Sequence, residues 1–155
     1  LYRTENRGQS WKALPIPDEI ESVNYVHIDK RSKSIYIACG LSDGVSESGG
    51  VWVSYDKGQT WEKFFHMPFV YQVTTAEYDS NRIAAAVAEN TTISNLNPGA
   101  YLSFDGGKTW NKSNQGLGQP YWIVDLKFDL TNPDIIWCGL NGSGWYKGVI
   151  DAKEL

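Results

Sequence analysis

Short runs of β-branched and aromatic residues, with polar residues interleaved, recur along the whole chain. Examples are VNYVHID, SIYIACG, VWVSYD and TWEKFF, and each is bounded by Gly, Pro, Asn or Asp. Such runs are typical of short β-strands. No apolar repeat with the helical period continues long enough to predict a helix. The pattern therefore predicts an all-β chain.

The chain repeats itself with a period of about 50 residues. The segment TENRGQSW at 4–11 is followed by SYDKGQTW at 54–61 and by SFDGGKTW at 103–110. A second marker, formed by Asp29, Asp79 and Asp129, keeps the same step. Each period holds four predicted strands, and a repeating four-stranded unit with tight turns is the signature of a β-propeller blade.

The repeat divides residues 1–155 into about three blade equivalents of a single β-propeller. The expected parts are the outer strands of a blade at 1–14, full blades at 21–65 and 70–114, and the inner strands of a blade at 120–151. This last blade has Ile150 where the repeated segment would place its Asp.

Propellers close with ~4–8 blades, so about three blades predict a partial ring. Two explanations stay open: the chain is a fragment of a longer propeller, or copies of the chain complete the ring together. Under either one, strands of another segment should pair beside residues 1–4 and 144–149, because open edges expose unpaired backbone groups.

Each position of the repeated segment has a predicted structural role. The Asp or Asn side chain accepts backbone hydrogen bonds within the turn, and the Gly adopts a conformation that a Cβ would resist. The hydroxyl groups bind remaining donors, and the Trp ring packs between strands or blades. The residues of this predicted structural set are Thr4, Asn6, Gly8, Trp11, Ser54, Asp56, Gly58, Thr60, Trp61, Ser103, Asp105, Gly107, Thr109 and Trp110.

The repeated segment resembles the Asp box, or BNR repeat, of sialidase-like and xyloglucanase-like propellers, the latter of glycoside hydrolase family 74 type. The motif also occurs in sortilin-type receptors and in a photosystem assembly factor. The copies at 54–61 and 103–110 match it fully, and the copy at 4–11 departs at Thr4, Asn6 and Ser10. The stretch KFDLTNPDIIWCGLNGSGWYKG also resembles xyloglucanase-type repeats.

This resemblance implies a propeller fold and leaves two function classes open, because one fold carries many functions. The first is a secreted carbohydrate-active propeller, either a xyloglucanase-like glycoside hydrolase or a glycan-binding protein. The second is a non-catalytic scaffold that binds protein, as in sortilin-type receptors or assembly factors. The partners implied are a carbohydrate and either the remaining blades or another copy of the chain.

Charge and composition exclude several classes of binding partner. The net charge is −4, with no long run of one sign, so neither nucleic acid nor an anionic membrane is an expected partner. No apolar stretch approaches the ~18 residues of a membrane span. Cys39 and Cys138 end apolar runs and are expected to be buried free thiols. Without a Cys/His cluster, neither a metal nor a cofactor is predicted.

Ligands of such propellers usually meet the rim opposite the Asp boxes, where the loops at 40–50, 89–99 and 139–144 are expected. Asp43 and Glu47 form the only close carboxylate pair in these loops. They could serve a glycosidase, or form a solvated acidic loop or a weak Ca²⁺ site. The other candidate ligand-binding residues, which could stack on sugar rings or pack in the core, are Tyr121, Trp122 and Trp145.

No catalytic residue is assigned. His27 and His66 lie in no recognisable nucleophile arrangement. The resemblance to sialidases implies three arginines that hold a carboxylate, yet three of the four arginines, Arg3, Arg7 and Arg31, flank turns on the Asp-box side, which argues against sialidase activity within this piece. The catalytic Asp motifs of xyloglucanases are not matched.

Three Asn-x-Ser/Thr sequons begin at Asn90, Asn111 and Asn141. Such sequons fit a secreted chain in a source that glycosylates proteins, although chance also produces them in an Asn-rich and Ser-rich sequence. The expected localisation is therefore extracellular, with the periplasm as the other compartment considered.

Overall fold

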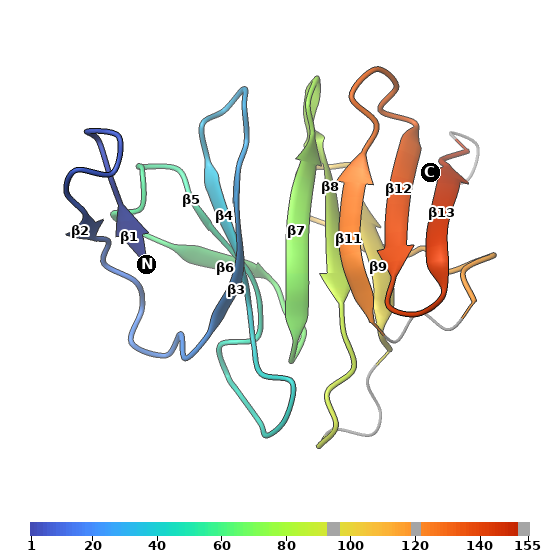
Figure 1. The fold of residues 1–155 in the computed structure, drawn as a ribbon, viewed down its shortest axis with the longest axis horizontal. Coiled ribbons are helices and arrows are strands. Elements are labelled where there is room, and N and C mark those ends of the chain that lie inside the picture. Colours follow the sequence, from blue (N-terminus) through green and yellow to red (C-terminus); the bar gives the residue numbers. More distant parts are fainter. Residues whose placement is uncertain (93–96, 119–121, 152–155) are drawn as a thin grey trace.

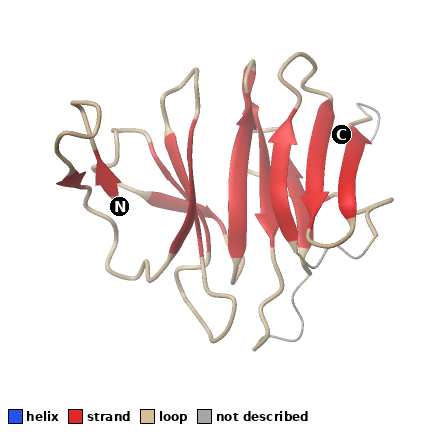
Figure 2. Cartoon of the chain, viewed as in Figure 1, coloured by secondary structure: helices blue, strands red, loops and turns tan. Residues whose placement is uncertain are grey.

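The structure of the chain is a computed structural model that describes residues 1–92, 97–118 and 122–151. Thirteen β-strands in this part form four antiparallel sheets, and the described residues contain no helix (Figure 2). The prediction of an all-β fold made of propeller blades is confirmed.

The first sheet has two strands and the second has four, paired in chain order. The strands of the first sheet are β1 (Tyr2–Arg3) and β2 (Lys12–Ala13). The strands of the second sheet are β3 (Val23–Ile28), β4 (Ile35–Cys39), β5 (Gly50–Ser54) and β6 (Glu62–Phe65).

The third sheet again has four strands and the fourth has three, also paired in chain order. The strands of the third sheet are β7 (Val70–Ala76), β8 (Asp79–Val87), β9 (Gly99–Ser103) and β10 (Asn111–Lys112). The strands of the fourth sheet are β11 (Ile123–Phe128), β12 (Ile135–Leu140) and β13 (Gly144–Val149).

The sheets follow one another side by side, from β1–β2 at the left of Figure 1 to β13 at the right. The turns β3–β4, β7–β8 and β11–β12 lie at the upper edge, on the side that also carries the Asp boxes. The β4–β5 and β12–β13 connections lie at the lower edge, which we call the loop rim (Figure 1). The fourth strands are shorter than expected, since β10 has two residues and begins one residue after Trp110.

The core lies between the sheets, because alternate residues of a strand face opposite sides. On β8, Ile83 and Ala85 join a cluster with Tyr36 and Val53 of the second sheet. The intervening Ala84 and Ala86 join a cluster with strands of the fourth sheet. The third sheet is therefore buried on both faces, as an inner blade requires.

The hydrogen bonds of the Asp boxes match the predicted turn. The Asp56 carboxylate accepts from Ser54 Oγ at 2.8 Å, and from Thr60 N and Oγ1 at 2.8 and 2.6 Å. Gly58 N donates to Ser54 Oγ at 2.7 Å. The hydrogen bonds from Thr60, through its side chain and its backbone, hold the pKa of the Asp56 carboxyl far below its usual range.

The Asp-box glycines also touch the preceding sheet. Gly107 has a φ of +91°, and a Cβ built there would lie 1.9 Å from the ring of Phe64. Gly58 has a φ of +86°, and its Cβ would lie 2.8 Å from Leu14. Leu14 and Phe64 each follow an Asp-box Trp by three residues. The boxes at 54–61 and 103–110 therefore each seat an apolar side chain from the sheet before them.

Arginines join neighbouring sheets at the same edge. Arg3 donates to the Lys57 carbonyl at 3.2 Å, and Arg31 donates to the Tyr78 carbonyl. Arg82 donates to the Pro133 carbonyl at 3.0 Å, and its guanidinium lies over the Phe104 ring. These three arginines are accordingly committed to contacts between sheets.

Asp29, which is 1% exposed, connects the second sheet to the third. Its carboxylate accepts from Ser32 N at 2.6 Å, Thr75 Oγ1 at 2.7 Å and Ser80 Oγ at 3.0 Å. Burial would raise the pKa of Asp29, but the hydrogen bonds, led by those from Thr75 and Ser32, lower it to about 2. His27 Nε2 lies 2.8 Å from Thr75 Oγ1, and its pKa is lowered by burial against the opposing charge of Asp29.

We expect Gly107→Ala to lower the free energy of unfolding by about 2–4 kcal/mol, from left-handed backbone strain plus overlap with Phe64. Gly142→Ala is the matched control, because Gly142 has a φ of +78° and nothing within 4 Å of the new Cβ. It should cost about 1 kcal/mol. Urea denaturation measures both, and equal costs would contradict the steric role of Phe64.

Stability should fall in two steps as the pH is lowered. Because the folded pKa of His27 is lowered, the unfolded chain takes up that proton first, and stability declines below about pH 6.5. Asp29, with a folded pKa of about 2 against an ordinary 3.8, contributes stability above pH 3.8 that is lost on the way down to pH 2.

Melting temperatures of the native chain and of His27→Gln, measured from pH 7 to pH 2, check this expectation. His27→Gln should flatten the upper step and keep the lower one. An unchanged upper step in the variant would show that another group causes it.

Candidate functional site

The innermost strand of each of the last three sheets carries a β-bulge close to its start at the loop rim. The register shifts between Val23 and Tyr25 in β3, between Val70 and Gln72 in β7, and between Ile123 and Asp125 in β11. The extra residues are therefore Asn24, Tyr71 and Val124. Bulges re-aim side chains and are frequent next to active sites, so the loop rim is the place to look for a binding site.

Three aromatic side chains meet at this rim, where β7 and β11 begin side by side (Figure 1). We call Phe69, Tyr71 and Trp122 the mouth group. The ring centroids of Phe69 and Trp122 are 6.2 Å apart at 80°, and those of Tyr71 and Trp122 are 6.1 Å apart at 60°. Trp122 is 38% exposed, so the group offers aromatic surface to solvent.

The backbone around the mouth group is tied down by hydrogen bonds. Asn141 N donates to the Trp122 carbonyl at 3.0 Å, which fixes the β12–β13 turn beside it. Ala88 N donates to the Phe69 carbonyl at 3.1 Å, and Gly40 forms an isolated bridge with Phe69. The aromatic rings thus stand on a backbone that several loops hold in place.

Of the three aromatic candidates that the sequence predicted for ligand binding, one lies in the mouth group. Trp122 belongs to the mouth group, whereas Tyr121 lies outside the described residues. Trp145 lies on β13 with its ring against Gly139, on the face of the fourth sheet that is turned away from the third. The sequence also missed Phe69 and Tyr71, since only the bulge and the packing of neighbouring strands place them beside Trp122.

The carboxylates of Asp43 and Glu47 are exposed on the β4–β5 loop. Neither carboxylate forms a hydrogen bond or ion pair with another residue in the described part of the chain; Glu47 contributes its backbone carbonyl, which accepts from Lys63 Nζ at 2.6 Å. No described group of three or more His, Cys, Asp and Glu side chains could hold a metal ion. At the loop rim, the aromatic rings of the mouth group are therefore the main candidate contacts for a ligand.

The β4–β5 loop is attached to the start of the β8–β9 connection by Asn90. The side-chain amide of Asn90, which is buried, donates to the carbonyls of Leu41 and Gly44 at 2.9 Å each. Gly44 N also donates to Thr92 Oγ1 at 2.7 Å. Of the three sequon asparagines, Asn90 is therefore buried, whereas Asn111 and Asn141 are exposed.

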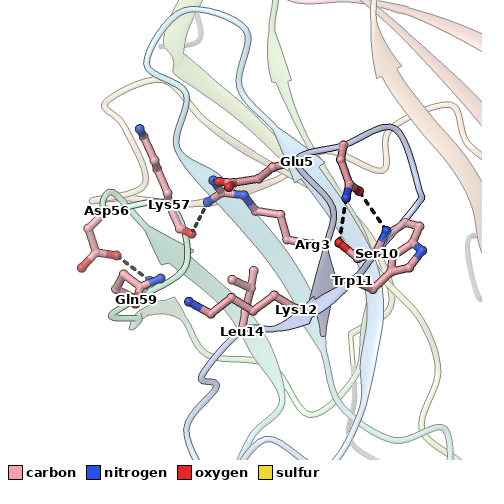
Figure 3. A pocket seen from close by; sticks show the side chains of 10 residues that line it. Arg3, Glu5, Ser10, Trp11, Lys12, Leu14, Asp56, Lys57 and Gln59 are labelled. Carbon is pink, nitrogen blue, oxygen red and sulfur yellow. Dashed lines mark hydrogen bonds and ion pairs between the residues drawn. The ribbon is translucent and has the colours of Figure 1, made fainter.

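A hollow lies on the opposite, Asp-box side. This cavity of about 610 Å³ is bordered by Arg3, Trp11, Leu14, Asp56 and Lys57, among others (Figure 3). Two of its charged groups are used in and between the turns, since Arg3 donates to the Lys57 carbonyl and Asp56 accepts from Gln59 N at 2.9 Å (Figure 3). It is a gap between two Asp boxes, and we do not assign it a ligand.

Other sequence expectations have direct structural outcomes. Cys39 and Cys138 are buried free thiols, and burial raises their pKa to about 12 and about 11. His27 Nε2 lies against the Thr75 hydroxyl, which donates to Asp29, and no Ser or Cys side chain forms a hydrogen bond with His27 in the described chain. Within the described residues, the structure has no helix with the length and apolar character needed to span a membrane.

Comparison with known proteins supports the architecture. The sequence model described as "Sortilin, neurotensin receptor 3" (Sortilin-Vps10) matches residues 1–142. The chain is similar to a xyloglucanase of Acetivibrio thermocellus, with 25% identity over 99% of this chain and 21% of the enzyme.

Solved structures resemble the fold at lower identity. An ancestral GH74 enzyme superimposes with a TM-score of 0.70 and 19% identity, over 95% of this chain and 19% of that one. A GH74 enzyme of Niastella koreensis gives a TM-score of 0.67 at 18% identity, over 96% and 25%. The chain thus spans about a fifth of the length of the xyloglucanase, which fits a propeller completed by further segments.

Replacing Asn90 by Ala should loosen the β4–β5 loop. Two carbonyl groups lose their donor, at a cost of about 1–3 kcal/mol in the free energy of unfolding. Limited proteolysis within residues 40–50 should become faster than in the native chain. Asn111→Ala, at an exposed position, is the control, and equal cleavage of both variants would contradict the role given to Asn90.

Proposed function

The chain belongs to the Sortilin-Vps10 family of propellers, and we propose that it forms part of a secreted carbohydrate-active propeller that binds a glycan at the mouth group. The observation that carries the proposal is the cluster of Phe69, Tyr71 and Trp122 at the loop rim. The similarity to a xyloglucanase supports it by giving the substrate class.

Aromatic rings suit this task because the C–H face of a sugar ring is apolar while its edge carries hydroxyl groups. The rings of Tyr71 and Trp122 meet at 60°, so they form a corner rather than a flat platform. In the proposed complex one sugar ring stacks on Trp122 and contacts Tyr71 at its side. The exposed Asn141 in the neighbouring turn is within the loop that would meet the sugar hydroxyls.

The hydrolytic form of this proposal needs two carboxylates at the same rim. The loop at 40–50 offers Asp43 and Glu47, which remain candidates for glycan contact, and no acid or base is assigned within the described residues. We therefore place glycan binding ahead of hydrolysis as the contribution of this chain. Hydrolysis would depend on carboxylates brought by further blades.

The alternative function is protein or peptide binding without catalysis. The observation that favours it is the family match itself, because the family is named after a receptor for neurotensin. An exposed aromatic cluster can also receive an apolar side chain of a peptide. This reading requires the same mouth group and differs only in the ligand.

The ring is proposed to be completed at two open edges. In the described sheets, β1 and β2 lack the two inner strands of a four-stranded blade, and the sheet that ends at β13 lacks the fourth strand, so strands of another segment of the same protein or of a second copy would pair there. Such pairing satisfies the free backbone groups of an edge strand.

Titration of the protein with xyloglucan oligosaccharides, cello-oligosaccharides and sialosides by calorimetry tests the proposal. Trp122→Ala and Tyr71→Ala should each weaken binding by about tenfold, because each removes a stacking face. Trp137→Ala is the matched control, since Trp137 is 40% exposed but lies on β12 away from the mouth group.

Hydrolysis of the same glycans, followed by reducing-sugar release, separates an enzyme from a binding protein. Absence of any glycan binding, together with capture of a defined peptide that depends on Trp122, would replace the proposal by the alternative. Equal loss of binding in the Trp137 control would remove the mouth group as the site.

A further inference from the structure

Asn24 joins the second sheet to the third at the loop rim. Its side-chain amide donates to the Gly40 carbonyl at the end of β4 and to the Val70 carbonyl at the start of β7, each at 2.9 Å. Its amide oxygen accepts from Ser22 Oγ at 3.0 Å. Both amide hydrogens and the oxygen are therefore used, and the side chain is fixed in one orientation.

The Val70 carbonyl belongs to the peptide unit that leads into Tyr71, the bulge residue of β7. A bulge leaves its extra residue outside the regular ladder, so the ladder alone does not fix the direction of this peptide. The hydrogen bond from Asn24 supplies a fixed contact at that point. The orientation of the Tyr71 side chain follows from the orientation of its peptide.

The three bulges differ in the residue that occupies them. Asn24 in β3 has an amide, whereas the equivalent positions hold Tyr71 in β7 and Val124 in β11. In β3 the amide that binds the backbone of the following sheet is the bulge residue itself, whereas in β7 it is the next residue, Gln72, whose Oε1 accepts from Leu126 N at 2.8 Å. Asn24 differs from Gln72 in its target, because it donates to the carbonyl that directly precedes the next bulge residue, Tyr71.

We propose that Asn24 is a positioning residue, which acts through the Val70 carbonyl to set Tyr71 against Trp122. Its effect on glycan affinity rests on the function proposed above. Its effect on the geometry of the mouth group does not, since that geometry exists without a ligand. The two claims can therefore fail separately.

The first measurement is the indole N–H resonance of Trp122 in the unliganded protein, assigned by its absence in Trp122→Phe. Asn24→Ala should shift this resonance, because the Tyr71 ring then changes its position relative to Trp122. Ser22→Ala, which removes only the donor to the Asn24 amide oxygen, should shift it in the same direction by less. If Asn24→Ala does not fold, the shift measured in Ser22→Ala tests the inference instead.

The matched control is Asn114→Ala. Asn114 is also an amide that bridges backbone groups, donating to the Pro98 carbonyl at 2.9 Å and accepting from Ala100 N at 3.0 Å. It should lower the melting temperature and leave the Trp122 resonance in place. A shift of equal size in Asn114→Ala would overturn the inference, because it would reveal a general loss of structure.

The second measurement is a double-mutant cycle on affinity for a cello-oligosaccharide or xyloglucan oligosaccharide. Asn24→Ala should weaken binding by about tenfold in the native background and have little effect when Tyr71 is already Ala, since it acts through Tyr71. Additive losses would overturn the inference. If the native protein binds no glycan, the proposed function fails, and the Trp122 resonance alone decides the role of Asn24.

Discussion

The second and third sheets of this protein are each seated on the sheet before them through a glycine that has no room for a side chain. The Asp box holds Gly107 at a φ of +91° directly over the ring of Phe64, and Gly58 has the same relation to Leu14. The carboxylate of the box satisfies the turn donors, so a polar turn can lie against an apolar side chain. The spacing of the sheets, and hence the position of the innermost strands, depends on this contact.

The contact between an Asp-box glycine and an apolar side chain is absent between the third and fourth sheets in the described part of the chain. Leu14 and Phe64 follow an Asp-box Trp by three residues, and Ser113 stands at that position after Trp110. The fourth sheet has Ile150 in place of the Asp, and so has no Asp-box glycine for an apolar side chain to cover. The loss of the box and the loss of its apolar partner thus occur together, although they lie in different blades. This pairing argues that the two features form one structural unit.

The two rims differ in the contacts that their side chains make. At the Asp-box rim the carboxylates and arginines are occupied by turns and by contacts between sheets, as Asp29 and Arg82 show. At the loop rim, bulges turn side chains such as Tyr71 away from the regular ladder. Aromatic surface is then left open at Trp122. The contacts that join the sheets and the exposed aromatic surface are accordingly separated along the length of the strands.

The sequence by itself determined the fold class, the repeat, the Asp-box turns and the free cysteines. These features are local or periodic. A turn such as Ser54–Trp61 closes through hydrogen bonds of its own side chains. The alternation of apolar and polar residues along a strand can be read directly from the sequence. Trp122 could be named from the sequence because of its place at a strand end.

Only the tertiary structure decided the composition of the candidate site and the use of Asn24, His27 and the arginines. A bulge depends on the register between two strands, and the contacts of Asn24 with Val70 or of Arg82 with Pro133 join residues about 50 positions apart. Nothing in the local pattern records which side chain of one blade meets which carbonyl of the next. Those contacts arise only when the sheets stack against one another.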